Sequence, residues 1–303
     1  MPIAVLSPAK TIDESPCDVA TTSPPFAAER AELLAACAAL SKAELRALMG
    51  ISEPLASLNH ARFVRFEAQP PKPACWAFDG PAHQALGFSS LAPAAQAWAH
   101  ERVVTLSGLY GCLRARDAVR PYRLEMGSRL RTARGATLYA FWGDRVAREL
   151  AGRVAREPRA ESRFVVNVAS EEYWKVVGPH AARLGAPVYT IKFPGPSVHA
   201  KQARGLYCRF LAEEEVETPA RLKEFAAWSA ARAGARFAYR LVDERAGGAK
   251  GELTFARVDG GTAAKPSAGA KRKPASDAPA EAADEGGSTK KARASAPKRT
   301  RRR

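Results

Sequence analysis

The sequence has no apolar run long enough to cross a membrane and no paired cysteine motif. Its 303 residues include five cysteines, none of which forms a C-x-x-C pair. An odd, scattered set of cysteines indicates reduced thiols rather than a disulfide framework. The N-terminus lacks the shape of a signal peptide, because the apolar run Ile3–Leu6 is short and no charge precedes it. We therefore expect a soluble, cytoplasmic protein without a membrane span.

Metal-ligand and cofactor motifs are equally scarce. The five histidines show no ligand pairing at short spacing. The stretch Gly108-x-x-Gly111 lacks the spacing of a phosphate-binding loop. Ser7-x-x-Lys10 has the spacing of a serine–lysine dyad, but the supporting motifs of such acyl-transfer enzymes are missing. We predict no metal, no cofactor and no catalytic residues. An active site assembled from distant residues remains an alternative.

What the sequence has in excess is positive charge. The formal net charge is +16 and the isoelectric point is near 10.0. Residues 258–303 carry twelve Lys or Arg and five Asp or Glu, so that +9 remains on residues 1–257. A summed positive potential attracts polyanions, and DNA is the best candidate partner. A basic protein without a polyanionic partner is the alternative.

The composition changes sharply from Asp259 onward. The last residues contain no Phe, Trp or Tyr and are rich in Ala, Lys, Pro, Ser and Gly. Such a segment cannot bury enough apolar surface to offset the loss of chain entropy. We predict a single domain over residues 1–257 and a disordered basic tail over residues 258–303. The tail resembles those of linker histones, which bind DNA through counterion release, although a solubilising extension is the alternative.

Strand and helix patterns alternate irregularly along the first 257 residues. This alternation predicts a mixed α/β or α+β domain. The expected strands lie at residues 3–6, 75–78, 102–106, 163–168, 188–193, 236–242 and 252–257, and the expected helices at 26–40, 43–49, 53–58, 137–156, 171–177 and 198–214, with one more from Thr218.

Residues 43–58 have the pattern of two helices joined by a glycine turn. Leu45 and Ile51 are spaced to pack one helix against the other. The turn Met49-Gly50-Ile51-Ser52 resembles the tip of a helix-hairpin-helix motif, where glycine lets backbone N–H groups approach DNA phosphates. Ser52 begins the next helix, whose N-terminus attracts anions, but it replaces the usual second glycine. An ordinary αα-hairpin that packs into the core is the alternative.

Further candidate phosphate ligands are cationic side chains near turns. An arginine-rich run extends from Arg114 to Arg134, with Tyr122 available to stack on a base. Lys10 lies in a tight turn after a buried strand, and Lys201 and Arg204 share one face of a helix. A solvated surface with a few ion pairs is the alternative. The predicted DNA-binding residues are Lys10, Gly50, Ser52, Arg62, Arg65, Arg114, Arg123, Lys201 and Arg204.

Several strings together resemble one known family. They are Ser7-Pro8-Ala9-Lys10-Thr11, Leu106-Ser107-Gly108-Leu109-Tyr110-Gly111, Arg120-Pro121-Tyr122-Arg123-Leu124-Glu125-Met126-Gly127, Phe141-Trp142-Gly143-Asp144, Asn167-Val168-Ala169-Ser170-Glu171-Glu172-Tyr173, Ala200-Lys201-Gln202-Ala203-Arg204-Gly205 and Gly251-Glu252-Leu253-Thr254-Phe255. In this order they are similar to the YaaA family of peroxide-stress resistance proteins, over residues 1–257. Ala115 and His199 depart from the residues usual in that family.

The resemblance implies a mixed α/β domain with an unusual fold and a basic cleft. It implies binding of duplex, branched or bubbled DNA, helped by a helix-hairpin-helix. It also implies a role in surviving hydrogen peroxide, by keeping unincorporated iron low and so limiting oxidative DNA damage. The main alternative function is an enzyme of unknown reaction with Lys10 and Lys201 in its cleft. Direct iron binding is disfavoured by the lack of carboxylate or histidine clusters.

Overall fold

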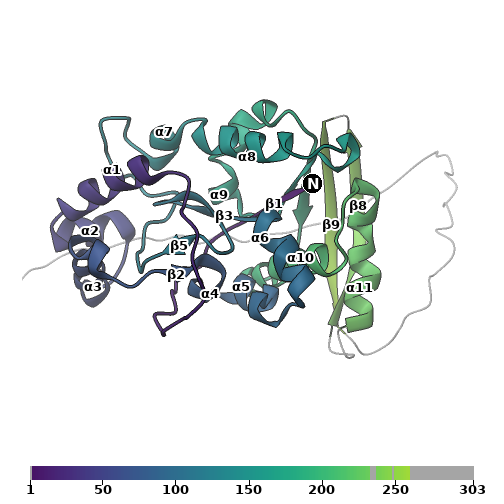
Figure 1. Cartoon of the computed structure of the whole chain (residues 1–303), viewed down its shortest axis with the longest axis horizontal. Coiled ribbons are helices and arrows are strands. Elements are labelled where there is room, and N and C mark those ends of the chain that lie inside the picture. The colour runs from purple at the N-terminus through teal and green to yellow at the C-terminus, as the bar shows by residue number, and fades with distance from the viewer. Residues whose placement is uncertain (1, 233–236, 248, 260–303) are drawn as a thin grey trace, which may run out of the picture. The chain divides into compact units, whose positions relative to one another are not determined.

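A seven-stranded sheet forms the centre of the protein. The computed structural model describes residues 2–232, 237–247 and 249–259 (Figure 1). In spatial order the strands are β4 (Gly111–Arg114), β3 (Val103–Ser107), β1 (Ile3–Leu6), β6 (Val165–Asn167), β7 (Val188–Lys192), β9 (Lys250–Asp259) and β8 (Phe237–Gly247). The five inner strands are parallel, and the two outer strands are antiparallel to their neighbours. The prediction of a mixed α/β fold is therefore confirmed.

Helices cover both faces of this sheet. Successive side chains of a strand point to opposite faces, so Ile3 and Val5 of β1 join one core cluster while Ala4 and Leu6 join another. The first cluster includes residues from α1 (Ala27–Ala38), α2 (Lys42–Met49), α3 (Glu53–Val64), α7 (Leu138–Trp142), α8 (Arg145–Ala155) and α9 (Glu171–Trp174). The second includes residues from α5 (Pro81–Leu86), α6 (Pro93–Arg102), α10 (Ser197–Glu213) and α11 (Phe225–Arg232). Because both faces are covered, β1 is an uninterrupted apolar run.

Several predicted elements differ from the structure, two of them in kind or number. Residues 75–78 do not form a strand, because Ala74–Ala77 is the short helix α4. A brief buried apolar run has no periodicity that separates strand from helix. The helix predicted over 137–156 is two helices, α7 and α8. Gly143 separates them with a φ of 52°, which is outside the helical range and ends α7.

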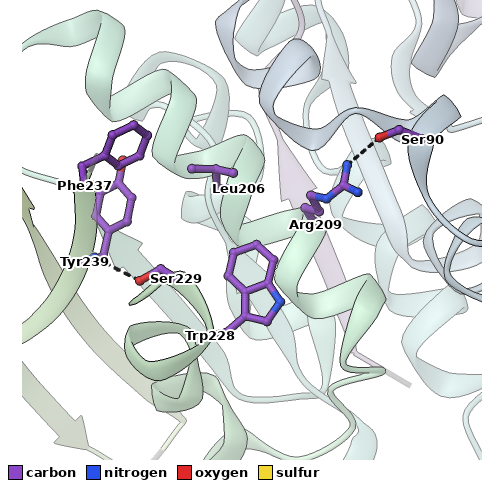
Figure 2. A pocket seen from close by; sticks show the side chains of 7 residues that line it. All are labelled: Ser90, Leu206, Arg209, Trp228, Ser229, Phe237 and Tyr239. Atoms are coloured by element: carbon purple, nitrogen blue, oxygen red, sulfur yellow. Dashed lines mark hydrogen bonds between the residues drawn. The ribbon is translucent and has the colours of Figure 1, made fainter. Parts of the chain in front are cut away.

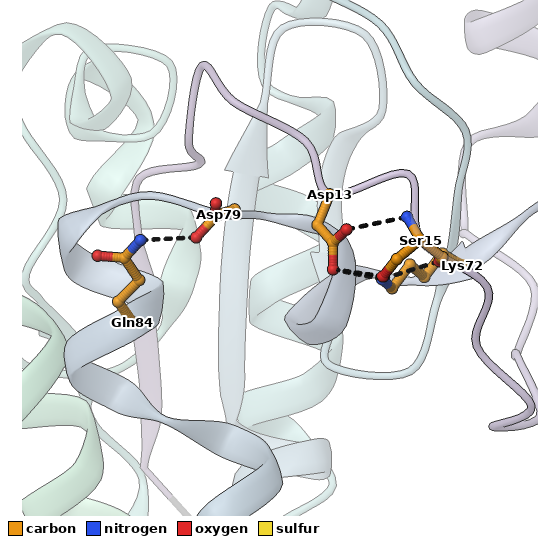
Figure 3. A network of polar contacts seen from close by, with 5 residues as sticks. All are labelled: Asp13, Ser15, Lys72, Asp79 and Gln84. Atoms are coloured by element: carbon orange, nitrogen blue, oxygen red, sulfur yellow. Dashed lines mark hydrogen bonds and ion pairs between the residues drawn. The ribbon is translucent and has the colours of Figure 1, made fainter.

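The segment between β1 and α1 is pinned to the body by polar contacts. The Lys72 ammonium, in the short strand β2 (Lys72–Pro73), lies 2.7 Å from Asp13 Oδ2 and 3.0 Å from Ser15 Oγ (Figure 3). Strand β2 pairs with β5 (Ala118–Val119) in a second, two-stranded sheet. Residues 10–15 therefore have a fixed path beside the main sheet. The predicted tail lies outside the described residues except for its first two, which end β9.

Candidate functional site

The order in which the chain adds parallel strands to the sheet reverses between β1 and β6. From β1 the chain next enters the main sheet at β3, on one side, whereas from β6 it continues to β7, on the other. In open α/β sheets the crevice at such a switch point, beyond the carboxyl ends of the strands, is the usual place for a ligand. Here the two departing loops are joined, because the Ser170 amide donates to Ser7 Oγ at 2.9 Å and the two hydroxyls lie 3.2 Å apart.

A compact charged cluster lies at this edge of the sheet. The Lys10 ammonium is 2.9 Å from Glu125, and the Arg123 guanidinium donates to the same carboxylate at 3.0 and 3.3 Å. Burial opposes ionisation of Glu125, but hydrogen bonds from Lys10 and Arg123 outweigh it and hold its pKa below the ordinary value. One carboxylate thus serves two cations, which leaves a local excess of positive charge. A narrow hollow beside them is lined by residues 8–10, residues 122–125 and Tyr173.

Buried hydroxyl groups lie next to this cluster. The Tyr122 hydroxyl is 2.6 Å from Ser107 Oγ, at the carboxyl end of β3, and Ser107 Oγ also accepts the Tyr110 amide at 2.9 Å. Burial raises the pKa of Tyr122 and of Tyr173, so both phenols are protonated at neutral pH. Because Tyr122 is only 5% exposed, the prediction that it can stack on a base is wrong.

The predicted helix–turn–helix is present in α2 and α3. Ser41 begins α2 with a capping box, and Leu45 is buried between the helices and the core. Gly50 ends α2 in the left-handed region at φ 58°, and a Cβ built on it would meet nothing within 4 Å. Ser52 begins α3 as the N-cap, and among the described residues its side chain makes no cap hydrogen bond. Gly50 and Ser52 are exposed, whereas Ile51 between them is buried, and the amides of Gly50 and Ile51 both donate to the Arg46 carbonyl.

The remaining predicted cations are distributed over several places. Arg62 forms an ion pair with Glu14, which lies on the same pinned segment as Lys10. Arg65 is exposed at the end of α3. Arg114 lies on the edge strand β4, where the buried Asp117 accepts from its Nε at 3.1 Å and its Nη2 at 3.0 Å.

Lys201 and Arg204 lie on α10, which packs against the opposite face of the sheet from α2 and α3. Lys201 is exposed. Burial lowers the pKa of Arg204, while the nearby Glu171 opposes this shift. Arg204 Nε is buried without a hydrogen-bond partner among the described residues. The structure thus joins Lys10 to Arg123 through the Glu125 carboxylate and connects Arg62 through Glu14 of the same N-terminal segment, whereas Arg114 lies elsewhere.

Sequence reasoning missed the acidic and hydroxyl members of the site. Glu125 stands two residues after Arg123 in the sequence, Ser107 is the last residue of β3, and Ser170 lies three residues after β6. The position of the two serines at the carboxyl ends of parallel strands is the signal that could have identified them. Over the described ranges, no three His, Cys, Asp or Glu side chains are placed to hold a metal ion. No helix in these ranges is long and apolar enough to span a membrane.

Comparison with known proteins gives a consistent family. The chain is 43% identical over 238 residues to a UPF0246 protein of Burkholderia lata, a match that covers 74% of this chain and 90% of that protein. A UPF0246 protein of Cereibacter sphaeroides is 43% identical over 238 residues, covering 74% of this chain and 91% of the relative. One from a Janthinobacterium strain is 43% identical over 237 residues, with 74% and 90% covered.

A family model described as "Peroxide stress protein YaaA" matches residues 2–230. The matched region includes every strand that contributes to the switch point, the helix–turn–helix and the Lys10–Glu125–Arg123 cluster. The tail lies outside the match. The chain therefore belongs to the peroxide stress protein YaaA family.

Proposed function

We propose that this protein binds DNA in the hydrogen peroxide stress response and limits oxidative DNA damage linked to unincorporated iron. The observation that carries the proposal is the exposed glycine turn between α2 and α3. At Gly50 the backbone has no side chain in the way, and at Ser52 the first turn of a twelve-residue helix opens to solvent. A helix N-terminus beside an exposed glycine turn suits a phosphate oxygen.

The two helices carry exposed positive charge. Arg46 lies one turn before Gly50 on α2, whereas Lys42 and Arg65 are exposed at the ends of α2 and α3 that are farthest from the turn. Contacts of this kind address the DNA backbone and not its sequence, so duplex, branched and bubbled DNA are all suitable partners. The net charge of +16 favours the encounter with any of them.

The Lys10–Glu125–Arg123 cluster offers a second phosphate contact. Lys10 keeps 61% of its side chain exposed although it is paired with Glu125. An ion pair with this exposure has little net stability, so a phosphodiester can compete with the carboxylate for the ammonium. The excess cation of the cluster remains available in either case.

The test measures fluorescence anisotropy of labelled duplex and bubble DNA with the full chain and with residues 1–261. The shorter chain retains every described element and forms one compact unit, so it separates the body from the basic tail. Binding by the body, with affinity that falls steeply as salt rises, is expected. Absence of binding by the body at low salt would overturn the proposal.

A pair of charge-reversal variants sharpens the test. Arg46→Glu with Arg65→Glu reverses two exposed charges on the helix pair, and Arg148→Glu on α8 with Arg156→Glu directly after it reverses two exposed charges elsewhere. The first pair should weaken DNA binding by about tenfold or more at low salt, and the second should have a much smaller effect. Equal losses from both pairs would argue against the turn as the binding element.

The switch-point position of Lys10 favours a second candidate function, that of an enzyme on a small substrate. Catalytic groups commonly occupy this edge of an α/β sheet. Lys10→Met retains the aliphatic stem and removes the charge. Loss of peroxide protection in cells with unchanged DNA affinity in vitro would favour the enzyme, whereas parallel losses would favour DNA binding.

A further inference from the structure

A second hollow lies next to the charged cluster and has a different chemical character. It has a volume of about 400 Å³ and is bounded by the helical residues after β6 and by strands β7, β8 and β9. Two successive residues of α9 line different hollows, since Tyr173 contributes to the one beside Lys10 and Trp174 to this one. The larger hollow has the size of common small-molecule sites.

One wall of the hollow is the indole ring of Trp174. The ring is partly exposed, and Gly178 and Gly247 add no side chain to the hollow, whereas a side chain at Gly251 would point at Tyr189. A Cβ at Gly178 would lie 3.0 Å from Trp174 Nε1, so a larger residue there would crowd the ring. An indole at the side of an open hollow is a stacking surface for a flat heterocycle.

Strands β7 and β9 supply polar groups to the hollow, in contrast to the apolar indole ring. Glu252 uses Oε2 in an ion pair with Lys192 at 2.6 Å, and among the described residues Oε1 has no partner and can accept from a ligand. Thr190 accepts from Asn167 Nδ2 at 3.4 Å, so its own hydroxyl hydrogen can be donated. The carboxylate favours a heterocycle with N–H donors on its edge and disfavours one with carbonyl oxygens there.

Cations lie beside this acceptor. Arg245 is 74% exposed and contacts Asp243 at 3.0 Å, and Lys250 is exposed. Both line the hollow together with Glu252. A ligand with a donor-bearing ring against Glu252 and a phosphate outside it satisfies both sets of charges. The carboxylate repels a phosphate placed next to it, which orients such a ligand.

We propose that this hollow binds the unpaired base of a guanine nucleotide. Guanine stacks on Trp174, and its N1–H and N2–H donors lie side by side on the edge that meets Glu252. Its phosphate meets Lys250 and Arg245. The proposal deepens DNA binding, on which its biological context rests, because an unpaired base is what bubbled or branched DNA offers and a continuous duplex does not.

The test uses free nucleotides, so that it is independent of duplex binding. Guanosine 5′-monophosphate, uridine 5′-monophosphate and ribose 5-phosphate are titrated into the full chain and followed by calorimetry and by saturation-transfer NMR. The guanine nucleotide should bind at least about fivefold more tightly than the uracil nucleotide, with ribose 5-phosphate weaker still. Equal affinities for the three probes, which would indicate phosphate binding alone, would overturn the proposal.

Variants assign the two recognition elements. Trp174→Leu should weaken binding of the guanine nucleotide by at least about fivefold, while Trp174→Phe retains most of it. Glu252→Gln should remove the preference for guanine over uracil, whereas Glu244→Gln on β8, which is paired with Lys223, should not. Unchanged preference in Glu252→Gln contradicts the assignment. Thermal unfolding checks that each variant is folded.

The two proposals fail separately. If the protein binds the guanine nucleotide but neither duplex nor bubble DNA, the proposed DNA-binding function is contradicted and the nucleotide site is supported. DNA binding without any response to guanosine 5′-monophosphate would sink the hollow alone.

Discussion

Lys10 lies 2.9 Å from a carboxylate oxygen of Glu125, whose other oxygen is held by Arg123. The carboxylate therefore occupies the place between two cations that a phosphodiester oxygen would take. Such an internal anion keeps the cations oriented in the free protein and competes with an external anion for them. The strength of this competition sets how much the cluster contributes to DNA binding.

Replacing Glu125 should therefore strengthen DNA binding. Glu125→Gln preserves the shape, removes the competing charge and frees the Lys10 ammonium. We expect the affinity for duplex DNA to rise by about threefold or more at low salt, with a steeper salt dependence. Glu149→Gln on α8, which pairs with Arg153, is the matched control and should change the affinity little. A lower affinity in Glu125→Gln would mean that the carboxylate is needed to orient the cations.

A substitution of Gly50 tests the cost of backbone strain alone, because an added side chain there meets no neighbouring atom. Gly50→Ala should lower the free energy of unfolding by about 1 kcal/mol, because φ is 58° and only glycine adopts this region without cost. No clash contributes, since nothing lies within 4 Å of the added Cβ. Gly50→Asn should cost less, because asparagine tolerates this conformation.

The matched control for the turn is a glycine in a helix. Gly152→Ala on α8 also meets nothing within 4 Å and should raise the free energy of unfolding by up to about 1 kcal/mol. Urea unfolding at neutral pH measures both. If the turn binds phosphates, Gly50→Ala should also weaken DNA binding, whereas Gly152→Ala should not. Opposite signs of stability change with equal DNA affinities would remove the turn from the interface.

Acid should loosen the segment that carries Lys10. Hydrogen bonds from the Lys72 ammonium and from Ser15 lower the pKa of Asp13 from 3.8 to about 2. Because the folded pKa is the lower one, this contribution to stability is complete above pH 4 and is lost as pH falls towards 2. It amounts to about 1 kcal/mol or less, since Asp13 is partly exposed and solvent screens the pair.

Asp13→Asn tests this directly. The variant should be less stable at neutral pH, partly because the buried Lys72 loses its charge partner, and its stability should vary less between pH 4 and 2. Thermal unfolding across this range gives the comparison, with Asp18→Asn as the exposed control. An unchanged pH profile in Asp13→Asn would contradict the assignment.

The thiols should withstand peroxide in the native state. Burial raises the pKa of Cys37, Cys75 and Cys112 to about 12, and it raises the pKa of Cys208 as well. Peroxide attacks the thiolate, so these four should react at least about 100-fold more slowly than an exposed cysteine. Cys17 and Cys75 are both partly exposed, and Cys17, which lies in the N-terminal segment, is the one whose thiol burial does not protect.

Mass spectrometry after brief exposure to hydrogen peroxide is the measurement. Oxidation should be found at Cys17 first, and the Cys17→Ser variant should react slowly until it is unfolded by guanidinium. Rapid oxidation of Cys112 in the native chain would contradict the burial argument.

Local patterns in the sequence were enough for the central strand and the hairpin. The run Ile3–Leu6 ahead of Ser7-Pro8 predicts β1, and Gly50 between two apolar spacings predicts the turn. The prediction failed at residues 137–156, where the apolar spacing continues through Gly143 although the backbone there leaves the helical region. A glycine inside an otherwise helical pattern gives no sign of its φ until its surroundings are known.

The site was harder to predict than the fold because its contacts are long-range. Lys10 and Arg62 could be identified as cations, but the carboxylates of Glu125 and Glu14 that hold them come from distant segments. Tyr122 looked available because it stands among arginines, yet packing turned its hydroxyl toward Ser107. The sequence shows which side chains carry charge, whereas their ion-pair partners depend on which segments the fold brings together.

The single-turn helix α9 has a consequence for how its neighbours respond to one another. Tyr173 and Trp174 are adjacent on the same four-residue helix, so a displacement of its backbone moves both residues. A ligand in one hollow that displaces this helix changes the affinity of the other hollow, and thermodynamic reciprocity makes the influence equal in both directions. Helix α9 thus links the two hollows, and the fluorescence of the Trp174 indole can report a movement of this helix.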